Sequence, residues 1–159
     1  MSYIQSTLIP GEEIIITPVV HNIVHARPII TFAIIGLLAL LIGIIDQSSD
    51  TWIAIAAIIF VDALLCGIWL GFGYLYYRRI EMAVTNKRVV CKTGIISVHS
   101  EELQWNRIES IEIRQGIFGR LLGYGDVYFS GTGVSYVRFG TIRDPWQTKA
   151  RAAEILTTK

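Results

Sequence analysis

Two long, almost uncharged stretches dominate the pattern of hydrophobic and polar positions along the chain. Residues 28–45 form the first stretch, which reads PIITFAIIGLLALLIGII. As a helix rising 1.5 Å per residue it would be about 27 Å long, close to the roughly 30 Å hydrocarbon core of a bilayer. Residues 52–77 form the second, in which Asp62 is the one charged residue. Because neither stretch has the polar face of a soluble helix, the pattern predicts a transmembrane helical hairpin over 28–77, with a short polar link at 46–50.

The segment 1–27 that precedes the hairpin is too short to form a domain of its own. Apolar residues recur at helical spacing over 19–24, which predicts a short helix lying at the cytoplasmic membrane interface. His21 and His25 are four residues apart, but no cysteine, aspartate or third histidine nearby completes a metal site. We therefore expect no metal here. The first apolar stretch also lacks a persuasive cleavage site, so it is expected to be an anchor and not a signal peptide.

From residue 80 the hydrophobic period changes to two. Ile80, Met82 and Val84 alternate with more polar neighbours, which is typical of a half-buried strand. The same pattern, interrupted by turn residues, predicts strands over 80–85, 88–92, 95–105, 108–114, 126–130 and 135–141. Short strands that follow one another in this way favour an antiparallel β barrel or sandwich over a βαβ fold.

The end of the chain returns to a helical pattern. Asp144 is a suitable N-cap and Pro145 a suitable first helical residue. Apolar residues then follow at spacings of four, three and three: Trp146, Ala150, Ala153 and Leu156. This stripe predicts a C-terminal helix of about three turns that covers an open end or edge of the strand layer.

Charge separates the chain into two unlike parts. Only 17% of the 159 residues are charged, and the shortage lies in residues 1–77, which hold one basic residue, Arg27, against five acids. Residues 78–159 hold thirteen basic residues against eight acids. Arg27, Arg78 and Arg79 flank the hairpin while its link is acidic, so the positive-inside rule places both termini in the cytoplasm. A net charge of +1 gives no general attraction to nucleic acid.

Several short motifs in a fixed order extend this picture. They are IPGE at 9–12, VTNKRVV at 84–90, KTGI at 92–95, RIESI at 107–111, FGRLLGYG at 118–125 and the Asp144-Pro145 pair. With them the chain resembles the membrane-anchored bacterial pleckstrin-homology-like (PH-like) family over nearly its whole length. The resemblance implies an α+β membrane protein of the bacterial cytoplasmic (inner) membrane. Its hairpin would be followed by a cytoplasmic PH-like domain at 78–159, a partly open barrel of two antiparallel sheets capped by the C-terminal helix.

Polar and small residues of the second apolar stretch are candidate interaction sites. Asp62 would lie near the bilayer centre, where an ionised carboxylate costs roughly 2.5–3.5 kcal/mol on insertion scales. We expect it to be protonated or hydrogen-bonded across a helix interface, or to face a wet cavity in an oligomer with an ion or proton role. Gly67 and Gly71 form a small-xxx-small pair, which suits dimerisation or packing within the hairpin. Cys66 and Cys91 are expected to be free thiols.

Basic residues around the first β hairpin are candidate contacts for anionic lipid. The resemblance implies this site, because PH domains that bind phosphoinositides use cations there, and each close cation contributes about 1 kcal/mol. The matching residues are Lys87 and Arg88, with Lys92 farther along. Arg78 and Arg79 add generic contacts beside the second apolar stretch.

Motifs that would indicate catalysis or a cofactor are missing from the sequence. No nucleophile elbow, zinc-binding HExxH or phosphate-binding glycine motif is present. The glycine-rich segment 116–125 instead carries Ile117, Phe118, Leu121 and Leu122, which we interpret as an apolar plug between strands. We therefore expect neither an enzyme nor a cofactor.

The leading functional hypothesis is a non-enzymatic PH-like scaffold that acts by protein–protein contact or self-assembly at the inner membrane. Its expected partners are the lipid bilayer and other copies or other membrane proteins, not nucleic acid. One alternative is an oligomeric channel or transport component in which Asp62 lines a path. The other is a sensor that binds anionic lipid through its basic residues.

Overall fold

The computed structural model describes residues 3–45, 49–95, 97–133 and 135–157. These residues form two compact units, one from Asn22 to Leu75 and one that joins the residues before it to those from Tyr76 onward. We name them the hairpin unit and the β unit. The elements, in chain order, are α1 (Tyr3–Ser6), β1 (Ile14–Ile16), η1 (Asn22–His25), α2 (Ala26–Ile45), α3 (Ser49–Arg78), β2 (Glu81–Thr85), β3 (Arg88–Thr93), β4 (His99–Gln104), η2 (Trp105–Arg107), β5 (Ile108–Arg114), α4 (Ile117–Leu122), β6 (Tyr124–Gly131), β7 (Tyr136–Arg143) and α5 (Pro145–Thr157).

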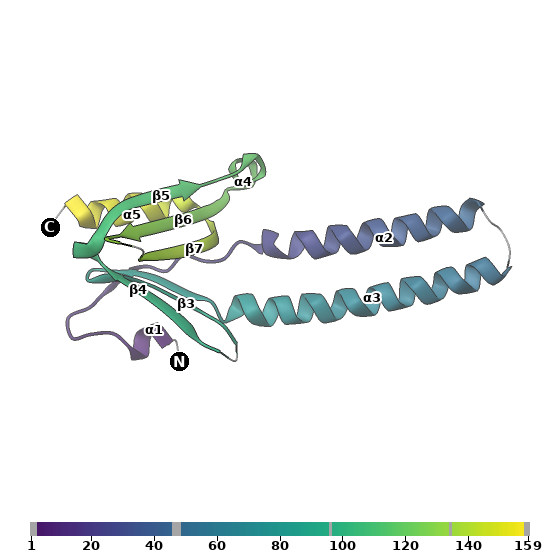
Figure 1. The fold of residues 1–159 in the computed structure, drawn as a ribbon, viewed down its shortest axis with the longest axis horizontal. Coiled ribbons are helices and arrows are strands. Elements are labelled where there is room, and N and C mark those ends of the chain that lie inside the picture. The colour runs from purple at the N-terminus through teal and green to yellow at the C-terminus, as the bar shows by residue number, and fades with distance from the viewer. Residues whose placement is uncertain (1–2, 46–48, 96, 134, 158–159) are drawn as a thin grey trace. The chain divides into compact units, whose positions relative to one another are not determined.

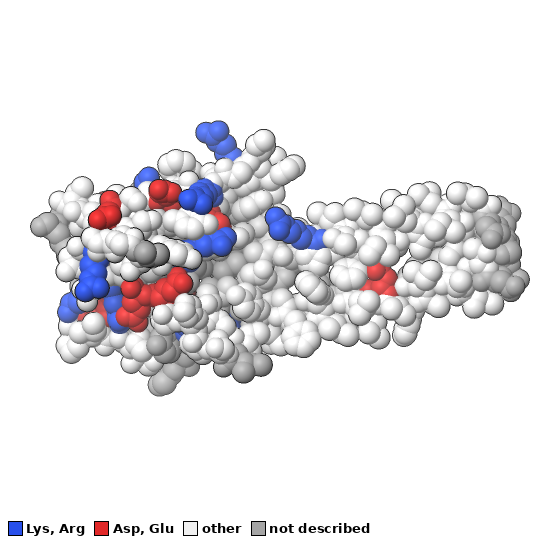
Figure 2. All heavy atoms as spheres, in the orientation of Figure 1, with Lys and Arg blue, Asp and Glu red and all other residues white. Residues whose placement is uncertain are grey.

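The hairpin unit consists of two long helices that run side by side (Figure 1). Both are long and apolar enough to cross a membrane, over Asn22–Ile45 and Thr51–Arg78, and they contain the stretches predicted from sequence. The predicted link at 46–50 includes 46–48, which lie outside the described residues. Charged side chains gather on the β unit, whereas the visible face of the hairpin is almost uncharged (Figure 2).

Small residues of α2 allow the two helices to approach each other. A Cβ added at Gly43 would lie 2.5 Å from Ile55 Cδ1, and one added at Gly36 would lie 4.0 Å from Asp62 Oδ2. Ala39, between them, is buried, as is Ile55. The spacing of 36, 39 and 43 places these residues on one face of α2, so the packing within the hairpin depends on small side chains of α2.

The β unit is built from two antiparallel sheets. The first has the strand order β1-β2-β3-β4 and the second the order β5-β6-β7. The register of the first sheet pairs Met82 with Cys91 and Val89 with Leu103. The described strands therefore form two separate sheets and not a closed barrel. The antiparallel sheets predicted from the period-two pattern are confirmed, and the β2–β3 turn falls at Asn86 and Lys87 as expected.

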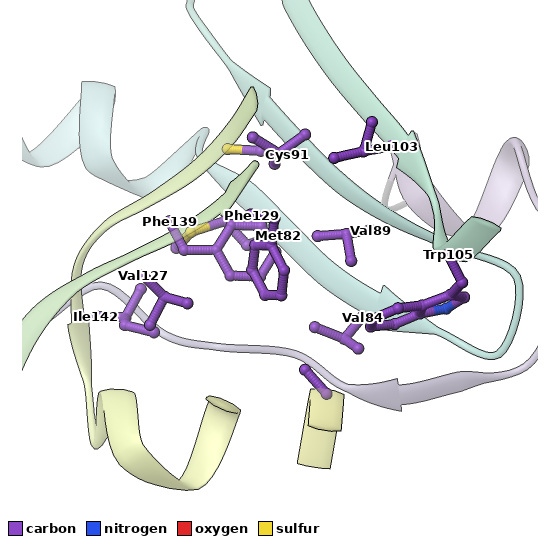
Figure 3. Close-up of a cluster of buried hydrophobic side chains, with 12 residues drawn as sticks. Met82, Val84, Val89, Cys91, Leu103, Trp105, Val127, Phe129, Phe139 and Ile142 are labelled. Atoms are coloured by element: carbon purple, nitrogen blue, oxygen red, sulfur yellow. The ribbon is translucent and has the colours of Figure 1, made fainter. Parts of the chain in front are cut away.

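The core of the β unit lies between the inner faces of the two sheets (Figure 3). Phe129 and Phe139 of the second sheet meet edge to face, with ring centroids 5.1 Å apart. Trp105 closes the cluster, and its indole Nε1 donates a hydrogen bond of 2.8 Å to the carbonyl oxygen of Thr85. Burial of alternate residues follows the period-two pattern of the sequence throughout β6 and in β7 as far as Phe139.

The N-terminal residues belong to the β unit, which differs from the separate interfacial segment expected over 1–27. Ile14 and Ile16 of β1 pair with Thr85 and Val84 of β2, and Val20 forms a bridge with Ile142 of β7. Ile4 of α1 is buried. The helical spacing over 19–24 did not determine the structure there, because backbone pairing with the sheets outweighs it, and helix begins only at Asn22.

The C-terminal helix α5 forms over the predicted residues but buries a different face. Pro145, Thr148 and Ala152 are buried, whereas Trp146 and Ala150 are exposed. The helix packs against β5, β6 and β1. The predicted buried face was therefore wrong. The face that is buried has small side chains at Thr148 and Ala152, which let the helix lie close to the sheet.

Candidate functional site

Two motifs far apart in sequence meet around the carboxylate of Glu12. The amide of Ile9 donates to Glu12 Oε2 at 2.8 Å, and the hydroxyl of Thr85 donates to Oε1 at 2.7 Å. Arg88 Nε donates to Oε1 at 2.9 Å. The Glu12 side chain has no exposed surface. We call this arrangement the Glu12–Arg88 clasp.

The remaining donors of Arg88 are also engaged. Its Nη1 pairs with the carboxylate of Glu102 on β4, and its Nη2 donates to the carbonyl oxygen of Thr7 at 2.6 Å. The guanidinium therefore joins the N-terminal segment to two strands of the first sheet. Arginine suits this role because its planar fork holds several acceptors at once.

The neighbouring turn residues bind the backbone of the same N-terminal segment. Asn86 Nδ2 donates to the carbonyl oxygen of Gly11, and Asn86 Oδ1 accepts from the amide of Glu13. Lys87 Nζ donates to the carbonyl oxygen of Pro10 at 2.7 Å. The TNKR turn thus recognises the IPGE segment through both side chains and backbone.

The clasp shifts the pKa values of both charged partners in the direction that keeps them ionised. Burial alone would raise the pKa of Glu12, but the hydrogen bonds from Ile9, Arg88 and Thr85 outweigh it, and the pKa lies below the ordinary glutamate value. Burial would lower the pKa of Arg88, but Glu12 and Glu102 raise it above the ordinary arginine value. The pair is charged at neutral pH.

The clasp changes the interpretation of the basic residues proposed to contact lipid. Arg88 is buried with its donors committed to the clasp, so little of its charge is available to a headgroup. Lys87 is exposed but donates to Pro10, and Lys92 lies 4.0 Å from a carboxylate oxygen of Glu81. Arg78 and Arg79 are exposed, at the end of α3 and just after it.

Asp62 lies on the face of α3 that is turned toward α2. It is half-buried, and among the described residues it makes no hydrogen bond or ion pair. It lines a shallow hollow of about 460 Å³ whose other lining residues are apolar: Phe32, Ile35, Ala57, Ile58, Val61 and Leu65. A single copy of the hairpin therefore offers this carboxyl neither the predicted hydrogen bond across the helix interface nor a polar path.

Gly67 and Gly71 lie on another face of α3. A Cβ added at either position would meet no described atom within 4 Å, in contrast to Gly43. The pair therefore does not serve packing between α2 and α3 in the described part of the chain. The glycines of α2 that face α3 are Gly36 and Gly43, which are seven residues apart and so lie on one face of the helix.

The predicted apolar plug at 117–122 is wrong. These residues form the short helix α4, and Ile117, Phe118, Leu121 and Leu122 are all exposed. In α4 only Gly119 is buried, and its backbone lies against Tyr124. A Cβ at this position would lie 2.6 Å from the carbonyl oxygen of Tyr124, so a larger residue would not fit. Gly119 brings the helix backbone close to the start of β6, and the large side chains of α4 point away from it.

The described residues hold no group of three or more histidine, cysteine, aspartate or glutamate side chains that could bind a metal ion. Cys91 is a buried thiol whose pKa is raised to about 12, first by burial and then by the nearby charge of Glu101. A thiol of this kind is a poor nucleophile. The clasp, for its part, has the chemistry of a structural ion pair.

The fold defines a class of protein in which two antiparallel sheets, covered by a C-terminal helix, are joined to a pair of long apolar helices. The model of the bacterial PH domain family matches residues 19–157, and the chain belongs to this family. The IPGE motif lies before the matched segment. No curated protein and no solved structure matches the chain.

Proposed function

We propose that this protein is a non-enzymatic PH-like module of the bacterial inner membrane, with both termini in the cytoplasm, that works by self-association. The hairpin anchors the module, and α3 carries the contact between copies. The observation that carries this proposal is the open surface at Gly67 and Gly71 on a helix whose packing against its own partner uses other residues.

The chemistry of this surface suits contact with a second helix in lipid. Two glycines four residues apart form a shallow groove into which another backbone can pack, and the close approach gains van der Waals contact that lipid chains do not provide. The exposed side chains of Leu64 and Ile68 border the two glycines. We call these four residues the Gly67–Gly71 face.

Charge supports the orientation. The basic residues nearest the apolar stretches are Arg27 at the start of α2, Arg78 at the end of α3 and Arg79 just after it. The predicted link between the helices carries only acidic charge. By the positive-inside rule this distribution favours cytoplasmic termini.

Native mass spectrometry of the full chain in mild detergent tests the self-association. We expect dimers or larger oligomers of the unaltered protein, and a shift to monomers for the double variant Gly67→Leu/Gly71→Leu. The matched control is Ala54→Leu, which adds a larger side chain at another exposed position of α3, about 140° around the helix from Gly67. Monomers of the unaltered protein, or equal association of both variants, would contradict the proposal.

A further inference from the structure

The helix α4 presents four large apolar side chains to solvent. Ile117 is 87% exposed, Leu121 81% and Phe118 72%, and Leu122 is also exposed. The four side chains lie on one side of the helix, at positions i, i+1, i+4 and i+5. An apolar patch of this kind on an otherwise charged unit marks an interaction surface. We call these residues, together with Trp146, the α4 patch.

The exposure of the α4 patch is fixed by specific contacts beneath it. Gln115 Nε2 donates to the carbonyl oxygens of Gly119 and Tyr124, both at 3.0 Å. Gly123, with φ of 72°, ends the helix in a left-handed conformation that only glycine adopts without strain. The backbone of α4 is thus held against the sheet while its apolar face points outward.

Trp146 and two arginines extend the surface. The indole Nε1 of Trp146 donates to Gln115 Oε1 at 3.1 Å, so the exposed ring lies next to α4. Arg120 is exposed on α4, and Arg143, paired with Tyr124 in the strand register, is exposed nearby. One carboxylate, Asp144, shares a hollow with Arg120 and Trp146. Aromatic and aliphatic groups bordered by arginines suit the interface of an anionic bilayer, where the rings enter the headgroup layer and the guanidinium groups contact phosphate.

The chain leaves the β unit for the first apolar helix close to this surface. The ring of His21 lies 5.4 Å from that of Tyr124, which is two residues after the end of α4. Only the four residues of η1 separate His21 from the start of α2, and a 3₁₀ helix of that length spans about 8 Å. If α2 enters a bilayer, the Tyr124 corner of the β unit therefore stays near its surface.

We propose that the α4 patch inserts into the interfacial layer of an anionic bilayer and so fixes the orientation of the β unit at the membrane. This inference rests on the membrane anchoring proposed above and is independent of the self-association. The hairpin unit holds the β unit at the bilayer, and the α4 patch determines which side of the β unit faces the bilayer.

Depth-dependent quenching in nanodiscs tests the insertion. The full chain, with Cys66→Ala and Cys91→Ala, receives Leu121→Cys labelled with an environment-sensitive fluorophore, in bilayers containing phosphatidylglycerol. We expect a blue-shifted emission and quenching by headgroup-proximal nitroxide lipids that is several-fold stronger than for the same label at the exposed control position Thr132→Cys. Phe118→Cys should behave as Leu121→Cys does.

Two results would overturn the insertion. A label at 121 that is quenched by a water-soluble agent as strongly as the label at 132 would show that the patch faces solvent. A blue-shifted label that nitroxide lipids do not quench would show that protein covers the patch. Extraction of the same membranes with alkaline carbonate reports the anchor separately, because an unanchored chain is released whatever the label shows.

Discussion

A buried ion pair must offset the free energy of desolvating two charges, and the Glu12–Arg88 clasp does so with hydrogen bonds from several partners. The carboxylate accepts from a backbone amide, a hydroxyl and the guanidinium, and the guanidinium reaches three acceptor groups. Removing Arg88 would leave the carboxylate of Glu12 buried without a counterion, and removing Glu12 would leave Arg88 with only the more exposed carboxylate of Glu102. The clasp therefore makes the attachment of the N-terminal segment sensitive to single substitutions.

The substitution Glu12→Gln should destabilise the β unit by about 3 kcal/mol, because it removes the charge that Arg88 faces in a buried site. Chemical denaturation of the full chain in detergent, followed by circular dichroism, measures the change. The control is Glu112→Gln, which breaks an exposed pair with Arg114 and should change stability by less than about 0.5 kcal/mol. Equal effects of the two variants would contradict the clasp.

The stability contributed by Glu12 should depend on pH in one direction. Its pKa is lowered in the folded state, so the contribution is present above the unfolded value of about 4.3 and is lost as the pH falls through the lower folded value. The difference in unfolding free energy between the unaltered chain and Glu12→Gln should therefore be constant from pH 7 to about 5 and shrink below about pH 4. A difference that grows on acidification would show that the carboxyl is protonated in the fold.

Cys91 should be unreactive in the folded protein. With a pKa of about 12 and a buried side chain, it has almost no thiolate at pH 8. In a chain with Cys66→Ala, a water-soluble thiol reagent should modify Cys91 only after denaturation. The control Thr132→Cys should be modified within minutes, and modification of folded Cys91 at the same rate would disprove the burial.

At the scale of elements, α5 shows how tertiary packing selects a helix face. Hydrophobicity alone favours burial of the helix face with Trp146 and Leu156. The face that packs against the sheet instead carries Thr148 and Ala152, whose small side chains permit close approach. The larger residues remain exposed, and Trp146 becomes part of the α4 patch.

The variant Ala152→Leu should cost about 1–3 kcal/mol, since it adds volume to a fully packed site. The variant Ala150→Leu makes the same change on the exposed side and should alter stability by less than about 0.5 kcal/mol. Thermal unfolding of the two variants in the same detergent compares them. A larger loss of stability for Ala150→Leu than for Ala152→Leu would show that the face predicted from hydrophobicity is the buried one.

The elements that the sequence predicts well are those with a regular local pattern. The two long helices follow from unbroken apolar stretches, and β6 shows the period-two alternation most clearly. Strand β1 was missed because its three isoleucines have no alternation and depend on β2 for pairing. The outward direction of α4 was missed because it depends on glycine contacts with Tyr124, which spacing in the sequence does not show.

The candidate sites were predictable to the same degree. The sequence identifies Gly67 and Gly71 through their spacing, but only the structure distinguishes them from Gly36 and Gly43, which pack inside the hairpin. The resemblance to PH domains implied that Arg88 is a lipid contact, and its buried partner Glu12 could not be foreseen because it lies 76 residues away. Long-range partners of this kind are not visible from one sequence.

At the scale of the whole molecule, each of the two units has its own proposed function. The hairpin unit is apolar and carries the Gly67–Gly71 face, and the β unit carries nearly all the basic charge and the α4 patch. We infer that the first unit brings copies together and the second takes a defined orientation at the surface. Either property can be removed by substitution without altering the residues of the other.

Cysteine cross-linking in native membranes tests the central claim most directly. In a chain with Cys66→Ala and Cys91→Ala, single cysteines are placed at Leu64, on the Gly67–Gly71 face, and at Leu70, on the side of α3 turned toward α2. We predict efficient oxidative dimer formation for Leu64→Cys and little for Leu70→Cys. Equal yields at the two positions, or no dimer at Leu64→Cys, would contradict self-association through the Gly67–Gly71 face.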